Sequence, residues 1–198
     1  MKFLLMLAVL MLLCASVAGA QSTWPYNDNN IGMYYDEAAT NYCCGSPPGT
    51  FVNVYLILTY ATSPTVGGWE AKITFEGAGA VPTAFVPRYP NVNAATRANE
   101  FIIGYGSPQP TDNGRLVLMD ITLYVLDGMI PAYGYVGPIC YHSAPEVLPA
   151  YLDGADLSVV VPMYPHLGGI DDWVISLNNG CVVDNETSSF GSVKSLFR

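Results

Sequence analysis

The feature that most constrains this chain is a strict alternation of apolar and polar side chains over residues 69–76. Successive side chains of a β-strand point to opposite faces, so the pattern predicts a strand with one buried and one solvated face. The predicted buried face carries Trp69, Ala71, Ile73 and Phe75, and the solvated face carries Glu70, Lys72, Thr74 and Glu76. Residues 53–60 alternate in the same way and predict a second half-buried strand.

A longer strand is predicted over residues 115–126, after the turn Asp112-Asn113-Gly114. Its predicted inner face carries Val117, Met119, Ile121, Leu123 and Val125. Shorter strands are predicted at residues 31–35, 84–86, 101–105, 133–141, 157–161 and 173–177, bounded by Gly, Pro, Asn or Asp. With no amphipathic helix between them, these strands predict an all-β fold, an antiparallel β-sandwich whose core includes Trp69 and Trp173.

The amino-terminal residues have the layout of a secretory signal. Lys2 precedes an apolar run over residues 3–13, and the small residues 17–20 end in an Ala18-x-Ala20 cleavage pattern. A lipid anchor on Cys14 is disfavoured by the bulky Leu13 before it. The apolar run is shorter than the roughly 20 residues of a membrane span. We expect a secreted protein, periplasmic, cell-surface or extracellular, with no transmembrane segment after cleavage.

This division leaves a signal peptide at 1–20, an amino-terminal segment at 21–30, the β-sandwich at 31–180 and a tail at 181–198. The tail places apolar side chains three or four residues apart, at Phe190, Val193, Leu196 and Phe197. That spacing predicts a short helix, which is too short to be stable alone. We expect its apolar stripe to pack on the sandwich or on a partner.

Cleavage of the signal would leave four cysteines, at Cys43, Cys44, Cys140 and Cys181. An even number in an oxidising compartment predicts two disulfides. A bond between the adjacent Cys43 and Cys44 would be strained, so each of them is predicted to pair with a distant partner. Which pairs with which stays open.

The charge balance excludes one class of partner. The chain has 16 acidic and 7 basic residues, a formal net charge of −9. Because binding to phosphates needs clustered Lys and Arg, nucleic acid is not an expected partner.

No catalytic constellation is present in the sequence, so no enzymatic activity is predicted. His142 and His166 have no metal-ligand spacing with each other or with a cysteine pair, and both are expected to be solvated. The chain also lacks a Gly-x-Ser-x-Gly elbow. A glycoside hydrolase remains an alternative, because folding can bring distant carboxylates together. Its candidate pairs are Asp36 with Glu37, Asp153 with Asp156, and Asp171 with Asp172.

Two further kinds of site are predicted from side-chain chemistry. Asp153, Asp156, Asp171 and Asp172 lie in glycine-containing loops and could hold a structural calcium ion, the one cofactor considered. The chain is also rich in tyrosine, with 14. Exposed aromatic rings stack on sugars, so Trp24, Tyr34, Tyr55 and Tyr124 are the predicted ligand platform, unless tyrosine is here only for its strand propensity.

The order of the strands resembles that of a known family. The run 54–58, the segment Gly68 to Phe75, the long strand 116–125, and Asp153-Gly154-Ala155-Asp156 leading into 157–161 together resemble the cohesin-like sandwiches of secreted bacterial proteins. The likeness covers residues 31–162 and implies a jelly roll related to carbohydrate-binding modules. No dockerin-contact motif is matched, so the resemblance implies the fold and no named partner. Residues 31–36 and 173–198 also resemble short secreted proteins of environmental bacteria, a likeness that names no activity.

Together these features predict a secreted, non-catalytic binding or surface-assembly module. Its expected ligand is a carbohydrate or an envelope protein. A structural or adhesive extracellular protein is the first alternative, with the apolar tail as the contact. A glycoside hydrolase is the second.

Overall fold

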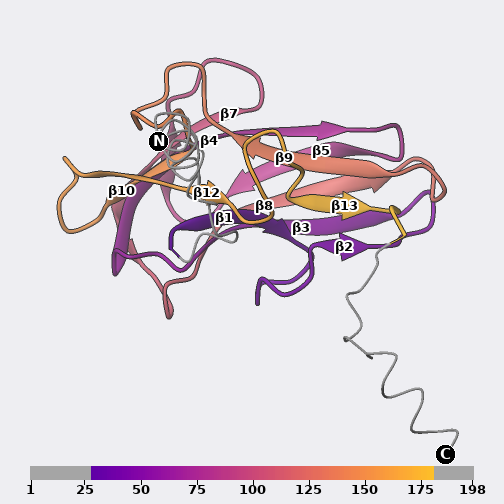
Figure 1. The fold of residues 1–198 in the computed structure, drawn as a ribbon, viewed down its shortest axis with the longest axis horizontal. Coiled ribbons are helices and arrows are strands. Elements are labelled where there is room, and N and C mark those ends of the chain that lie inside the picture. Colours follow the sequence, from indigo (N-terminus) through magenta and orange to yellow (C-terminus); the bar gives the residue numbers. More distant parts are fainter. Residues whose placement is uncertain (1–27, 181–198) are drawn as a thin grey trace, which may run out of the picture.

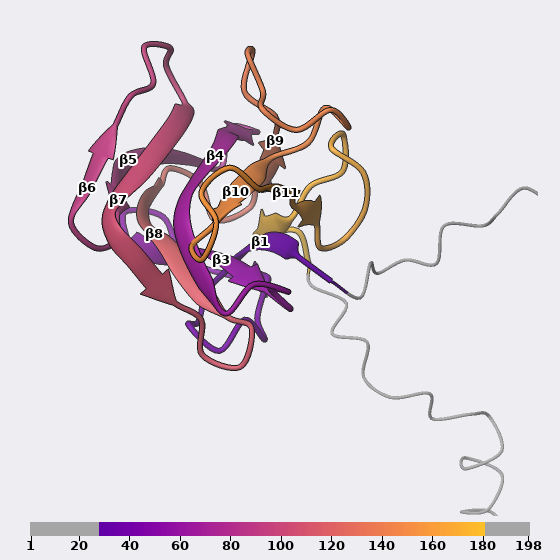
Figure 2. The same cartoon turned by 90° about the vertical axis from the view of Figure 1, so that its left-hand side faces the viewer.

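The computed structural model describes residues 28–180 as two β-sheets packed face to face (Figures 1 and 2). A sheet of five strands follows the order β12-β1-β3-β8-β5. Its strands are β1 (Asn30–Tyr34), β3 (Phe51–Thr59), β5 (Ala80–Pro87), β8 (Leu116–Val125) and β12 (Tyr164–Pro165). The described residues contain no helix, so the predicted all-β sandwich is confirmed.

The second sheet has eight strands. They are β2 (Cys43–Cys44), β4 (Thr65–Glu76), β6 (Asn91–Asn93), β7 (Glu100–Pro110), β9 (Ala132–Gly137), β10 (Ala150–Asp153), β11 (Val160–Pro162) and β13 (Ile175–Leu177). The order β11-β10-β4-β9-β13-β2 runs across it, and β7 pairs with both β4 and β6. Two pairs depart from the predicted antiparallel arrangement, because β1 runs parallel to β12 and β2 runs parallel to β13.

The core lies between the two sheets. The five-stranded sheet contributes side chains such as Met33 and Leu56, and the eight-stranded sheet contributes Trp69, Ile73 and Val136. Trp69 is 3% exposed, as its place in the alternating pattern predicts. The alternation therefore identified the buried face of β4.

One irregularity in β8 changes which of its side chains are buried. Leu56 pairs with Met119 and Ile57 pairs with Val117, so Leu118 is the extra residue of a β-bulge. A bulge shifts the two-residue period, and Leu118 and Met119 are both fully buried. The predicted inner face of residues 115–126 is therefore wrong before the bulge, where Leu116 is buried and Val117 is only half-buried.

Three further side chains differ in burial from the sequence predictions. Glu70 was expected in solvent, but it is 7% exposed because its carboxylate accepts hydrogen bonds from the Ser143 backbone N–H and Oγ. In the alternation of residues 53–60, Ile57 falls with Asn53, Tyr55 and Thr59 on the predicted solvated face, but it is fully buried. Trp173, predicted to be core, is half-buried and lies against Tyr133 with 6.1 Å between ring centroids.

The prediction of two disulfides is wrong for Cys44 and Cys140, which carry free thiols. Cys43 is disulfide-bonded, as predicted, and its partner is neither of these two cysteines. Cys43 Sγ accepts a hydrogen bond from Ser176 Oγ at 3.2 Å. Cys181, the signal peptide at 1–20, Trp24 and the helix predicted in the tail lie outside the described residues.

Within residues 28–180, no helix is long and apolar enough to cross a membrane. Secretion and the boundaries of the domain stay predictions.

Replacing Leu118 with Ala tests whether the bulge residue belongs to the core. Its side chain is fully buried, so the truncation leaves a cavity and should lower the free energy of unfolding by about 2 to 5 kcal/mol. Urea unfolding followed by tryptophan fluorescence measures the loss. Val86 lies on β5 with 56% of its surface exposed, and Val86→Ala should change stability by less than about 0.5 kcal/mol. Equal effects of the two substitutions would contradict the assignment.

Candidate functional site

A cleft of about 400 Å³ lies where β1, β3, β12 and the turn before β8 come together. We call it the tyrosine cleft. It is lined by Tyr34, Ala38, Ala39, Thr40, Tyr42, Thr59, Tyr60, Asp112, Asn113, Arg115 and His166. Tyr60 is 64% exposed and Tyr42 is 37% exposed, so two aromatic rings are open to solvent at its mouth.

Both ring nitrogens of His166 are buried in the cleft. Its backbone N–H donates to the Ile31 carbonyl at 3.0 Å, continuing the parallel pairing of β12 with β1. The imidazole lies 4.7 Å from the ring of Tyr34 and 5.3 Å, edge-on, from the ring of Tyr42. A side chain at position 32 would come within 2.3 Å of His166 Nδ1, so Gly32 makes room for the imidazole.

Burial keeps His166 neutral. Neither ring nitrogen has a hydrogen-bond partner among the described residues, and desolvation lowers the pKa of His166 to about 4. The prediction that His166 is solvated is therefore wrong. At neutral pH the imidazole acts as an uncharged ring that packs between two tyrosines.

The loop over residues 36–41 forms one wall of the cleft. The Asp36 carboxylate accepts hydrogen bonds from the Thr40 N–H, Thr40 Oγ1 and the Asn41 N–H, and the Tyr35 N–H donates to the Asn41 carbonyl. Burial acts to raise the pKa of Asp36, but these hydrogen bonds outweigh it and hold the pKa below its ordinary value. The carboxylate therefore fixes the shape of this wall.

The opposite wall is the turn that leads into β8. Asp112 and Arg115 exchange backbone hydrogen bonds of 2.8 and 2.9 Å, and Asn113 and Gly114 have φ angles of 50° and 74°. Asn and Gly tolerate this left-handed conformation, which confirms the turn predicted here. The Arg115 guanidinium then reaches across and donates to the Ala38 carbonyl at 3.1 Å. Arg115 thus joins the two walls.

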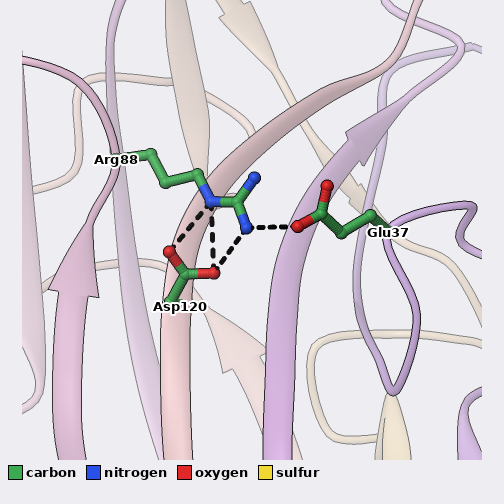
Figure 3. A network of polar contacts seen from close by, with 3 residues as sticks. All are labelled: Glu37, Arg88 and Asp120. Carbon is green, nitrogen blue, oxygen red and sulfur yellow. Dashed lines mark hydrogen bonds and ion pairs between the residues drawn. The ribbon is translucent and has the colours of Figure 1, made fainter.

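A second hollow of about 350 Å³ continues beyond Arg115, with Ala38, Asp112 and Arg115 lining both. We call the two hollows together the arginine–tyrosine groove. In the second hollow, Arg88 lies between two carboxylates (Figure 3). Its Nε and a terminal nitrogen donate to Asp120 of β8 at 2.7 to 3.1 Å, and the same terminal nitrogen contacts Glu37. Hydrogen bonds to Arg88 lower the pKa of Glu37.

Two of the predicted platform residues, Tyr34 of β1 and Tyr55 of β3, pair directly across neighbouring strands. Tyr34 is 4% exposed in the wall of the cleft, while Tyr55 lies under Arg88 with 5.4 Å from the guanidinium carbon to the ring centroid. Tyr124 lies against Phe51, with 5.1 Å between centroids. The three tyrosines therefore form no single exposed row, and their part in ligand binding stays a prediction.

Three of the four predicted calcium ligands accept hydrogen bonds from protein groups. Asp153 accepts from Ser63 Oγ and the Ala155 N–H, Asp156 accepts from Ser158, and Asp172 accepts from the Gly169 N–H. Asp171 is exposed. Among the described residues, no group of three or more His, Cys, Asp or Glu side chains is placed to hold a metal ion. Calcium binding stays a prediction.

Similar solved structures are cohesin modules, the family that the sequence resemblance named. The sixth cohesin of scaffoldin B from Acetivibrio cellulolyticus, solved with a Cel5 dockerin, is 10% identical, covers 76% of this chain and 98% of its own, and has a TM-score of 0.46. A type II cohesin from the same organism is 9% identical, covers 77% and 96%, and has a TM-score of 0.45. The seventh type I cohesin of Pseudobacteroides cellulosolvens is 11% identical, covers 76% and 90%, and scores 0.44. No protein-family model matches the sequence, and no curated protein matches it.

The pH dependence of stability should report the burial of His166. Its pKa is about 4 in the folded protein and 6.5 when exposed, so between these values the unfolded chain binds more protons. Protonation of His166 therefore leaves the free energy of unfolding unchanged above pH 6.5 and lowers it by roughly 3 kcal/mol as the pH drops toward 4.

Chemical denaturation at a series of pH values, for the wild type and for His166→Phe, measures this contribution. The phenylalanine variant should lose less stability between pH 6.5 and 4, whereas His142→Gln should follow the wild type. Parallel curves for the wild type and His166→Phe would show that His166 is not buried in the neutral form.

Proposed function

We propose that this protein is a non-catalytic binding module that holds a carbohydrate chain in the arginine–tyrosine groove. The observation that carries the proposal is the continuity of two hollows, of about 400 and 350 Å³, on either side of Arg115. Each is within the size range of a small-ligand site, and an elongated ligand would fill both.

The side chains of the groove suit sugar units. Tyr42 and Tyr60 present exposed aromatic surface against which the apolar face of a sugar ring can pack. Thr40 and Asn113, together with the charged Asp112 and Arg115, supply donors and acceptors for hydroxyl groups. An aromatic surface edged by a few polar groups is the usual composition of a ligand pocket.

The groove is also held in shape before a ligand arrives. Arg115 bonds the Ala38 carbonyl, Arg88 joins Glu37 to Asp120, and Asp36 closes the loop between them. A preformed site loses less conformational entropy on binding. In the wall formed by the turn before β8, Asp112 and Arg115 lie 3.8 Å apart as an ion pair, so their charges offset each other, which favours a neutral polysaccharide.

Removal of the exposed tyrosines tests the proposal. Tyr42→Ala and Tyr60→Ala should each weaken binding about tenfold, since a packed aromatic ring contributes roughly 1.5 kcal/mol. The measurement is native affinity electrophoresis in gels containing hydroxyethylcellulose, xylan or galactomannan, in which binding retards the acidic chain.

Tyr141→Ala is the matched control, because Tyr141 is 82% exposed and does not line the groove. Its migration should equal that of the wild type. Binding that survives loss of both Tyr42 and Tyr60 would remove the groove as the site, and a wild-type chain that none of the polysaccharides retards would overturn the carbohydrate proposal.

A further inference from the structure

A second surface lies at another end of the sandwich, where the loop before β3 meets the turn joining β8 to β9. Four apolar side chains are open to solvent there: Phe51 at 67%, Leu126 at 51%, Met129 at 89% and Ile130 at 41%. We call them the apolar end. From it we infer that the apolar end is the docking site for residues 181–198 of the same chain.

The backbone segments that carry these four side chains lie against one another. Phe51 pairs across the sheet with Tyr124, and the Gly49 N–H donates to the Val125 carbonyl beside Leu126. The Leu126 N–H donates to the Gly79 carbonyl, and Gly79 lies directly against Ile130. Exposed apolar surface of this kind is uncommon on a monomeric protein unless something covers it.

A shallow hollow of about 430 Å³ adjoins this surface, lined in part by Pro48, Gly128, Met129 and Asn178. Asn178 holds its two sides together, because its Oδ1 accepts from the Ser46 N–H at 2.7 Å and its Nδ2 donates to the Asp127 carbonyl at 3.3 Å. The hollow is therefore formed by the last residues of the described chain and by the two loops of the apolar end.

The position of Asn178 indicates which segment would cover the apolar end. The chain passes from β13 through Asn178 to Gly180, so the described part of the chain ends two residues after a residue that lines the hollow. Figure 1 shows β13 directed toward the same end as the turn between β8 and β9. Phe190 is ten residues beyond Gly180, a reach of up to roughly 33 Å, so it can contact any part of the apolar end.

The composition of that segment complements the surface. Phe190, Val193, Leu196 and Phe197 can cover the exposed apolar side chains. Residues 181–198 contain two acidic side chains, Asp184 and Glu186, and two basic ones, Lys194 and Arg198, in a chain with 16 acidic and 7 basic residues. Both basic side chains lie in residues 187–198, the part that carries the apolar residues, so docking would pair this basic part with an acidic body.

Tryptic cleavage after Lys194 in the full chain tests this inference. Docking shields Lys194, so Met129→Glu should speed cleavage there about fivefold or more, which is the effect of losing about 1 kcal/mol of docking free energy. Met129 is 89% exposed in the body, so the substitution should not unfold it. Val92→Glu, at a residue 72% exposed on β6, is the matched control and should leave the rate unchanged.

A double-mutant comparison provides a second measurement. Phe190→Ser with Phe197→Ser should lower the melting temperature, and adding Met129→Glu should lower it no further, because both changes remove the same contact. Fully additive effects, or equal cleavage rates for Met129→Glu and Val92→Glu, would overturn the inference. So would sedimentation showing a dimer that Met129→Glu dissociates while cleavage after Lys194 is unchanged, since the occupant would then be a second copy.

Discussion

Burial of two facing sets of side chains between the sheets is the constraint on which the rest of this structure depends. Trp69 and Ile73 on one sheet meet Leu56 and Met119 on the other in a single cluster. Charged residues are only 12% of the chain, so few strong polar contacts are available to hold the sheets by other means. The loops that carry the groove and the apolar end are positioned by this core.

Two arginines hold one wall of the arginine–tyrosine groove in place. Arg88 directly follows β5, and Arg115 directly precedes the neighbouring strand β8. Both donate hydrogen bonds to the loop over residues 36–41. Arg115 donates to a backbone carbonyl, whereas Arg88 pairs with carboxylates at partly exposed positions. Since exposed ion pairs add little to stability, the contribution of Arg88 is better described as positioning the loop.

The sequence predicts the fold better than it predicts the site. The period of two in residues 69–76 locates a real strand, because it records which side chains face the core. It fails at Leu118, since the run from Leu116 to Met119 is entirely apolar and a bulge within it leaves no mark in the pattern. It fails again at Glu70, whose burial depends on Ser143, far along the chain.

The groove could not be predicted because no local pattern describes it. Tyr42, Tyr60, Arg115 and His166 come from four separate connections between strands. Within the groove, only the turn at Asp112-Asn113-Gly114 has a recognisable signal in the sequence. The prediction of the platform tyrosines rests on residue type alone. The positions of the groove residues depend on the pairing of β1 with β12 and on the hydrogen bond from Arg115 to the Ala38 carbonyl.

The way the five-stranded sheet ends has a consequence for association between molecules. An open strand edge offers unpaired N–H and C=O groups to which another chain can add. Here one edge is only the two residues of β12, and the other is β5, which contains Pro82 and Pro87. Proline has no N–H to donate, so a strand from a second molecule would find gaps in the ladder. The sheet is thereby protected against edge-to-edge aggregation.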